Sequence, residues 1–165
     1  MIESDKVHVL YRHTNMPFSL TILGSSSAIP TNKRYPSAQV LCNNNQLFLI
    51  DCGEGTQMQM QKYAIKANRI NHIFISHMHG DHYFGLPGLI STFNLLGRTK
   101  DLHIYAPPEL ENILELQNKA ANTTFRYKII FHHLCANTEK LLYEDDTLSI
   151  EHVPLKHRIA TFELL

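Results

Sequence analysis

Short apolar runs alternate along this chain with polar segments that contain Gly, Pro and Asn. Apolar runs that are rich in β-branched and aromatic residues and bounded by turn residues are typical of buried strands. The pattern predicts strands at 18–24, 38–42, 46–53, 70–76, 102–107, 126–134, 140–146 and 148–155, and another that begins at 157. Asn43–Asn45 separates two of these runs and predicts a hairpin turn, because asparagine tolerates a positive φ.

Three segments with helical spacing interrupt the predicted strands. Gly53–Lys66 spaces its apolar residues loosely like a helix, with Glu54 near the positive end of the helix dipole. Gly85–Gly97 predicts a helix that begins near its proline and ends at its last glycine, and Pro108–Ala120 predicts a helix with proline at its start. Gly24–Ser37 reads as a loop. Strands broken by helices predict a layered α/β domain.

Length and composition are those of one ordinary globular domain. The chain has 165 residues, 44% hydrophobic and 18% charged, which is enough apolar material for a core. Fifteen basic and fifteen acidic side chains cancel, so net charge neither favours nor excludes a nucleic-acid partner. Cys42, Cys52 and Cys135 are odd in number and widely spaced, which favours reduced thiols in a cytoplasmic protein.

The N-terminus contains no recognisable targeting segment. Residues 1–16 have no clear hydrophobic period and carry too many charges for a signal peptide, so we expect an N-terminal extension of uncertain order. The apolar run Phe18–Leu23 is too short to span a membrane.

A cluster of histidines follows the strand predicted at 70–76. His77, His79 and His82 fall within six residues, around Asp81. Imidazole and carboxylate are natural zinc ligands, and a loop that leaves a strand end can turn several of them the same way. Two metal ions sharing the loop would place His77 and His79 on one ion and Asp81 and His82 on the other. Gly80 would let the loop fold tightly.

A histidine near a strand end is more often a polar surface residue than a ligand. We assign that ordinary role to the histidines outside the cluster, namely His8, His13, His72, His103, His132, His133 and His152. The HxHxDH spacing is much harder to explain in this way, and its predicted context of strand, loop and helix is that of a metal site.

The segment "HMHGDH" resembles the metal-binding signature of the metallo-β-lactamase superfamily. Leu47–Gln59, "LFLIDCGEGTQMQ", and His79–Arg98, "HGDHYFGLPGLISTFNLLGR", are similar to the ribonuclease Z family within it. The resemblance runs from about Phe18 to the last residue. It implies an α/β fold in which this chain is the N-terminal half of a metallo-β-lactamase-type αβ/βα sandwich, with residues 17–165 lying in that domain.

The resemblance also implies a function. Members of the family are zinc-dependent endoribonucleases that remove the 3′ trailer from precursor tRNA, leaving a 3′-hydroxyl on the tRNA and a 5′-phosphate on the trailer. We therefore expect a cytoplasmic enzyme with two zinc ions, homodimeric when full length and acting on precursor tRNA without a membrane partner.

The resemblance also implies which residues form the site, because motifs of the family match positions of this sequence. Val153–Phe162, "VPLKHRIATF", is similar to the family's third metal motif and makes His157 a ligand beside His77 and His79. Asp81 would also accept a proton from the attacking water. Asp51 matches an aspartate beneath the metal site, where a carboxylate fixes the tautomer of a ligand histidine. The remaining matches are the RNA-binding positions Lys33 and Arg34.

The sequence departs from the family in one large way. Family members continue past the third motif to further metal ligands and a tRNA-gripping arm, whereas this sequence stops at Leu165. We therefore expect the chain alone to be inactive. Two alternatives stay open: another phosphodiesterase or arylsulfatase-like hydrolase with the same fold, and a non-catalytic metal-binding fragment.

Overall fold

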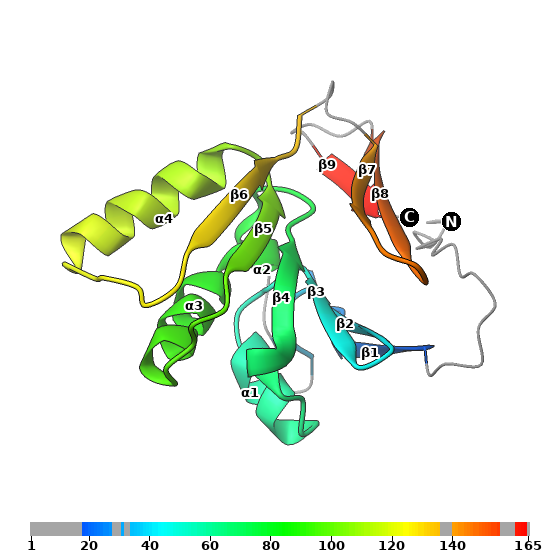
Figure 1. Ribbon diagram of the computed structural model, residues 1–165, viewed down its shortest axis with the longest axis horizontal. Coiled ribbons are helices and arrows are strands. Elements are labelled where there is room, and N and C mark those ends of the chain that lie inside the picture. The colour runs from blue at the N-terminus through cyan, green and yellow to red at the C-terminus, as the bar shows by residue number, and fades with distance from the viewer. Residues whose placement is uncertain (1–17, 28–30, 32–33, 136–139, 156–160, 165) are drawn as a thin grey trace.

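Two sheets and several helices make up the structure, a computed structural model that describes residues 18–27, 31, 34–135, 140–155 and 161–164 (Figure 1). A six-stranded sheet has the order β1-β2-β3-β4-β5-β6, and a three-stranded sheet has the order β7-β8-β9. The strands are β1 (Phe18–Gly24), β2 (Ala38–Asn43), β3 (Gln46–Ile50), β4 (Ile70–Phe74), β5 (Leu102–Ala106), β6 (Ile129–His133), β7 (Leu141–Glu144), β8 (Ser149–Leu155) and β9 (Thr161–Leu164). The helices are α1 (Thr56–Lys62), the 3-10 helix η1 (Ala67–Arg69), α2 (Gly80–Tyr83), α3 (Leu86–Leu95) and α4 (Glu109–Ala120).

The large sheet changes from antiparallel to parallel at β3. β1, β2 and β3 pair antiparallel, whereas β3, β4, β5 and β6 pair parallel. Asn44 and Asn45 make the turn between β2 and β3 with φ values of 49° and 70°, which confirms the predicted hairpin. Since the strands from β3 onward run the same way, their carboxyl ends lie at one edge of the sheet, where ligands commonly bind in α/β proteins.

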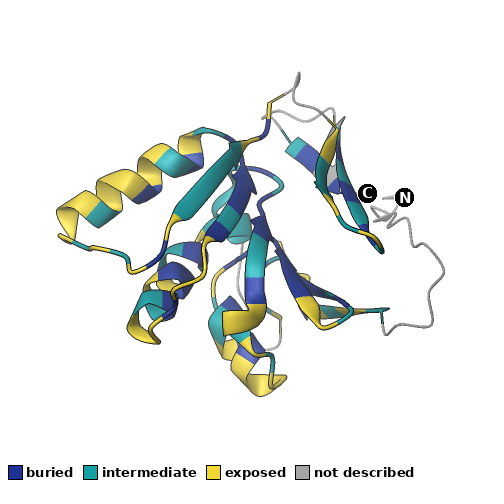
Figure 2. Ribbon diagram, viewed as in Figure 1, coloured by how far each residue is buried: buried dark blue, intermediate teal, exposed yellow. Residues whose placement is uncertain are grey.

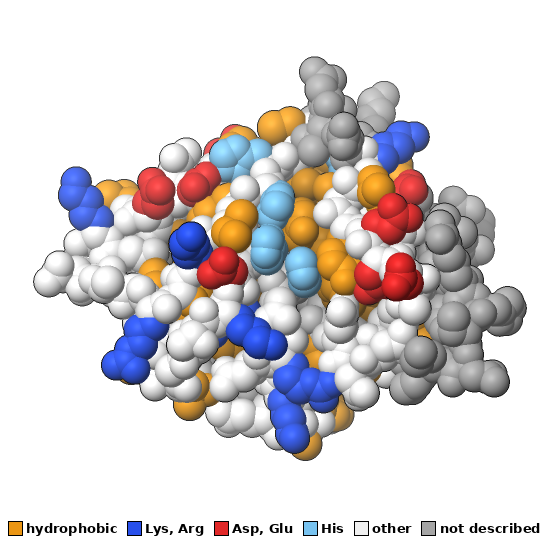
Figure 3. Space-filling model, in the orientation of Figure 1, with side chains coloured by type: hydrophobic (Ala, Val, Ile, Leu, Met, Phe, Trp, Pro, Cys, Tyr) orange, Lys and Arg blue, Asp and Glu red, His pale blue; other side chains and the backbone are white. Residues whose placement is uncertain are grey.

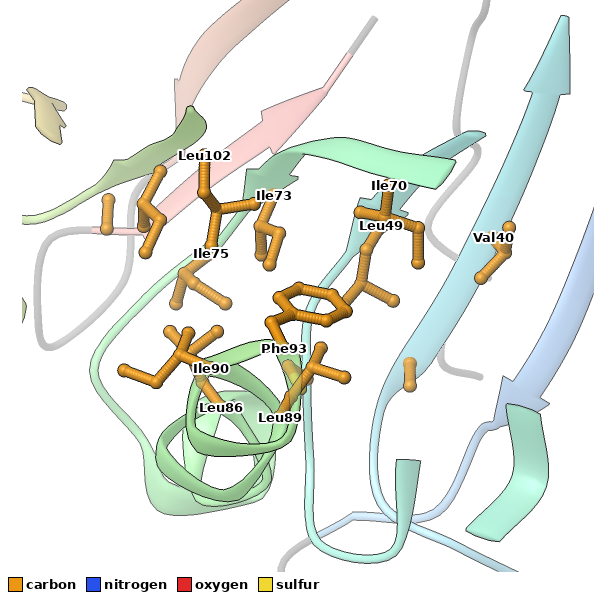
Figure 4. Close-up of a cluster of buried hydrophobic side chains, with 14 of the residues drawn as sticks. Val40, Leu49, Ile70, Ile73, Ile75, Leu86, Leu89, Ile90, Phe93 and Leu102 are labelled. Atoms are coloured by element: carbon orange, nitrogen blue, oxygen red, sulfur yellow. The ribbon is translucent and has the colours of Figure 1, made fainter. Parts of the chain in front are cut away.

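Alternating side chains give each face of the large sheet its own core. On β3, Leu47 and Leu49 join the cluster beneath the helices, whereas Phe48 and Ile50 join the cluster beneath the small sheet. Figure 4 shows the first cluster, with Phe93 of α3 between the helix and the strands. The central strands β2 to β5 are the most buried part of the large sheet, whereas β1 and β6 at its edges are mostly intermediate or exposed, and the outer sides of the helices are exposed (Figure 2).

A row of histidines crosses the face of the large sheet opposite the helices. The rings of His72 and His103 lie 5.0 Å apart between centroids, and those of His103 and His132 lie 5.2 Å apart (Figure 3). Burial, followed by the charges of His103, His132 and Arg98, lowers the pKa of His72 to about 4. These three side chains are therefore members of a stacked row and not isolated surface groups.

The surface role assigned to the remaining histidines is correct for one and wrong for another. His133 is exposed at the end of β6. His152 on β8 is fully buried and packs edge-on against Phe162, with 5.2 Å between ring centroids. Strand alternation turns His152 inward, which a single-residue assignment could not show. His8 and His13 lie outside the described residues.

The helices differ from the prediction mainly near the histidine cluster. α1 is shorter than the expected Gly53–Lys66, because Gly55 before it and Ala64 after it have φ values of 82° and 54°, outside the right-handed helical region. The short helices α2 and η1 were not predicted. α3 is followed by Gly97 at φ 75°, as expected of a glycine beyond a helix end. Within the described part of the chain, none of the helices combines the length and apolar character that crossing a membrane requires.

Phe93 provides a test of this core. Its side chain is 0% exposed at the centre of the helix-side cluster, so Phe93→Ala should lower the free energy of unfolding by about 3–5 kcal/mol. Leu95 on the same helix is 85% exposed, and Leu95→Ala should change it by less than about 0.5 kcal/mol. Urea unfolding followed by circular dichroism measures both, and equal losses for the two variants would contradict this packing.

Candidate metal centre

The carboxyl ends of β3 and β4 bring Asp51 beside the histidine cluster. Asp51 directly follows β3, and its backbone N–H donates to the carbonyl of Phe74 at the end of β4, 2.8 Å away. Asp51 has a φ of 55°, a left-handed conformation that non-glycine residues adopt at some energetic cost. The chain therefore turns sharply here and directs the carboxylate toward the loop after β4.

The Asp51 carboxylate joins three segments of the chain. Ser76 donates to Oδ1 from both its backbone N–H and its hydroxyl, each at 2.9 Å. The Ser37 hydroxyl donates to Oδ2 at 3.0 Å. His82 Nδ1 lies 2.6 Å from the same oxygen, and because a carboxylate only accepts, the ring N–H is the donor. The carboxylate thereby holds the ring of His82 in one orientation.

Close backbone contacts lock the histidine loop onto the loop after β3. The N–H of Cys52 donates to the carbonyl of His82 at 2.7 Å, and the N–H of Gly85 donates to the carbonyl of Cys52 at 2.8 Å. A Cβ on Gly53 would lie 2.4 Å from the carbonyl oxygen of Asp81, and one on Gly85 would lie 2.2 Å from that of Gly53. Glycine is therefore required at both positions for this approach.

The four predicted ligands of the loop lie together. His77 Nε2 is 3.0 Å from His79 Nδ1, and the rings of His77 and His82 lie 3.9 Å apart between centroids. Asp81 and His82 both belong to α2, and Asp81 Oδ2 is 3.6 Å from His82 Nε2. These four side chains therefore lie close to one another, and their role as metal ligands stays a prediction.

The surroundings of His77 and His82 shift the pKa values of these two rings in opposite directions. Burial, then the charge of His82, lowers the pKa of His77 to about 4, so His77 is neutral at pH 7. Burial alone would also lower the pKa of His82, but the hydrogen bond and charge of Asp51 and the charge of Asp81 outweigh it and raise that pKa. His82 therefore stays protonated to a higher pH than His77, and it must lose this proton before it can bind a metal ion.

The donor chemistry fits a metal ion. His82 donates through Nδ1 to Asp51, which leaves Nε2 as its coordinating nitrogen, and this is the arrangement in which carboxylates support metal-bound histidines. As the side chains stand, the part of the chain that the structure describes contains no group of three or more His, Cys, Asp or Glu residues placed so that it could hold an ion. His77 Nε2 and His79 Nδ1 lie 3.0 Å apart, a separation that permits both nitrogens to bind one ion, so the described residues lack a third ligand placed beside this pair.

The other predicted site residues lie apart or outside the described residues. Arg34 is exposed on the loop between β1 and β2. Its backbone N–H donates to the hydroxyl of Thr31 at 3.0 Å. Lys33 and His157 lie outside the described residues.

A cavity of about 510 Å³ opens beside the cluster. Its lining residues are Ser27, Pro36, Glu54, His79, Gly80, Asp81 and Phe84. A volume of about 300–1,000 Å³ is usual for a small-ligand site, so one nucleotide would fit. Sequence patterns did not indicate Glu54 or Phe84 here, nor the roles of Ser37 and Ser76, because these side chains meet only through the fold.

Comparison with known proteins identifies related sequences. The model of the family described as Anti-Pycsar protein Apyc1 matches residues 18–160. Proteins named ribonuclease Z are 50% identical in Bacteroides fragilis and 49% identical in Bacteroides thetaiotaomicron, each over 142 residues. These matches cover 86% of this chain and 47% and 45% of the respective proteins, so the chain spans about half the length of the curated relatives it matches. The resemblance to ribonuclease Z is thereby confirmed.

Solved structures confirm the predicted fold class. Human tRNase Z, short form, superposes with a TM-score of 0.78 at 34% identity, covering 87% of this chain and 62% of that one. The metallo-β-lactamase fold protein YhfI from Bacillus subtilis superposes with a TM-score of 0.68 at 19% identity, covering 90% of this chain and 57% of that one, which shows the fold alone. The chain is an α/β protein with this fold.

The Asp51–His82 contact generates a prediction about protonation. Asp51→Asn removes the negative charge and leaves only a neutral amide oxygen as acceptor for the His82 ring, so the raised pKa of His82 should fall. NMR titration of the His82 ring in metal-free protein measures it. Zinc affinity of the unsubstituted protein should likewise weaken as the pH drops through the raised pKa, because protons then compete with the metal.

Asp101→Asn is the matched control, since it removes an exposed carboxylate that makes none of the His82 contacts described above. It should leave the His82 titration unchanged. A His82 titration that is identical in Asp51→Asn and unsubstituted protein would show that the hydrogen bond does not control this ring.

Proposed function

This chain belongs to the family described as Anti-Pycsar protein Apyc1, and from its additional likeness to ribonuclease Z we propose that it is the N-terminal part of an enzyme that removes the 3′ trailer from precursor tRNA. The observation that carries the proposal is the 50% identity to a ribonuclease Z over 86% of the chain. In this proposal residues 17–165 form the N-terminal part of the catalytic domain, and the full-length protein is a cytoplasmic homodimer.

The proposed cofactor is a pair of zinc ions. His77, His79 and His157 would hold one ion, and Asp81 and His82 the other. Support for His157 comes from its neighbours in sequence, because Leu155 and Thr161 line a cavity together with His77 and His82. Bound zinc would supply positive charge for the phosphoryl oxygens and make nearby water more acidic.

The chain's own residues would orient the site and move a proton. Asp51 holds His82 through the 2.6 Å contact, so the coordinating nitrogen is already directed. Asp81 lines the cavity and would accept a proton from the attacking water. The water oxygen would bond to phosphorus, the bond from phosphorus to the 3′ oxygen would break, and that oxygen would take up the proton that the attacking water released to Asp81. The products are a tRNA 3′-hydroxyl and a trailer 5′-phosphate.

RNA affinity in this proposal comes mainly from outside the cavity. The described residues that line the cavity include two carboxylates and no Lys or Arg, so they offer no cation to the RNA backbone. Lys33 and Arg34, which lie between β1 and β2 in the sequence, would contact phosphates, and Arg34 is exposed.

Another phosphodiesterase of the same fold is the second candidate, because the matching family model does not carry the ribonuclease Z name. The deciding experiment incubates the full-length protein, with zinc or with a chelator, with precursor tRNA and separately with bis(p-nitrophenyl) phosphate. Zinc-dependent release of the intact trailer supports the proposal. Turnover of the small diester without cleavage of precursor tRNA would favour the second candidate. The 165-residue chain alone should cleave neither.

Asp81→Ala should separate chemistry from binding. In the full-length protein it should lower kcat for precursor tRNA by at least about 100-fold, because it removes a metal ligand and the proton acceptor. The Kd for RNA should change by less than about threefold, since phosphate contacts elsewhere dominate affinity. Single-turnover cleavage and gel-shift titration on one RNA measure both, with exposed Asp146→Ala as control. Cleavage by Asp81→Ala at the unsubstituted rate would refute the catalytic role.

Lys33→Ala combined with Arg34→Ala should have the opposite effect. Binding of precursor tRNA should weaken by about 10-fold or more, and the slope of log Kd against log salt concentration should decrease by about two, one for each lost phosphate contact. Cleavage at saturating RNA should persist. An unchanged salt dependence of binding would exclude these two residues as phosphate contacts.

A further inference from the structure

Phe84 is a large aromatic residue that the fold leaves open to solvent next to the candidate metal centre. Its side chain is 62% exposed, and it directly follows α2, which carries Asp81 and His82. One part of the ring rests on Gly80, where an added Cβ would come within 2.2 Å of ring atom Cε2. The ring is thus held against the metal loop while most of its surface faces the solvent.

Anchoring of α2 to the core does not depend on Phe84. The neighbouring Tyr83 is partly buried and packs against the helix-side core, and its ring meets that of Phe84 edge to face at 5.0 Å between centroids. Tyr83 therefore joins this segment to the core, whereas the exposed Phe84 lines the cavity together with His79 and Asp81.

The chemistry of the cavity explains why an aromatic surface is useful there. Among the described residues that line it, Glu54 and Asp81 are acidic, and neither Lys nor Arg is present. The described lining residues therefore offer a nucleotide neither a Lys nor an Arg side chain. The base is the part of a nucleotide that an aromatic side chain can hold, because bases stack on such side chains whatever their identity.

We propose that Phe84 is a stacking platform for a nucleobase next to the scissile phosphate. The inference rests on the proposed function and adds to it a substrate-binding residue and the part of the substrate that the residue binds. The Phe84 ring would hold the flanking base at the rim of the cavity, which places the phosphate beside Asp81. Stacking on a side chain does not discriminate strongly among bases, which suits an enzyme that meets many tRNA and trailer sequences.

The test uses the full-length protein and a substitution cycle. Phe84→Leu keeps an apolar side chain that can still pack against Gly80, and it removes the flat ring. Precursor tRNA is prepared intact and with an abasic residue on one or the other side of the scissile bond. On intact RNA, Phe84→Leu should raise KM and the gel-shift Kd roughly 5- to 100-fold, the range expected for loss of one stacked base. Because ground-state binding is lost, kcat at saturating RNA should stay within about twofold.

The abasic RNAs distinguish stacking from a merely structural role. One of them should bind the unsubstituted protein as weakly as intact RNA binds Phe84→Leu, and on that RNA the substitution should have no further effect. Phe84→Trp should restore binding to intact RNA. Tyr63→Leu removes a 49% exposed aromatic ring at the end of α1, away from the cavity, and should leave binding unchanged.

Three results would overturn the inference while leaving the proposed function intact. They are unchanged RNA binding by Phe84→Leu, equal weakening on intact and on both abasic RNAs, and a loss of kcat comparable to the rise in KM. An unsubstituted full-length protein that neither binds nor cleaves precursor tRNA would instead refute the proposed function, and this inference with it.

Discussion

The buried carboxylate of Asp51 is the group on which the candidate site depends. A buried charge is costly unless it is paired and hydrogen-bonded, and this one accepts from the backbone and hydroxyl of Ser76, the hydroxyl of Ser37 and the ring of His82. These donors come from three different segments. The same carboxylate thus stabilises the junction of the segments and sets the protonation of His82, so fold and chemistry cannot be changed separately at this position.

Backbone packing imposes a second constraint on the same junction. The loop after β3 approaches the metal loop so closely that side chains are excluded at Gly53 and Gly85. The hydrogen bond from the N–H of Cys52 to the carbonyl of His82 holds the two loops at this short separation. The backbone positions of the candidate ligands are consequently constrained by main-chain contacts, which would support a metal site at this junction.

Much of the fold could be predicted because it is encoded locally. The Asn44–Asn45 turn and the glycine after α3 follow from the φ values that these residues tolerate, and the strands follow from their apolar runs. The short helix α2 could not be predicted, since four residues carry too little pattern. Ser76 and the buried His152 were missed for another reason: their roles depend on neighbours that are distant in sequence. Motif spacing predicted the histidine cluster, but it contained no information on the contact between His77 and His79.

The loop that carries Arg34 is joined to the metal site at its base. Pro36 lies so close to Gly24 that an added Cβ there would come within 1.8 Å of the proline carbonyl oxygen, and the N–H of Gly53 donates to the carbonyl of Ser37 at 2.9 Å. Ser37 in turn donates to Asp51. A short path of contacts and hydrogen bonds therefore connects the loop of Arg34, a position proposed to bind RNA phosphate, with the carboxylate that orients His82. In the proposed enzyme, a phosphate held by that loop would be linked to the cavity through this path, and binding energy gained outside the cavity would contribute to positioning the scissile bond.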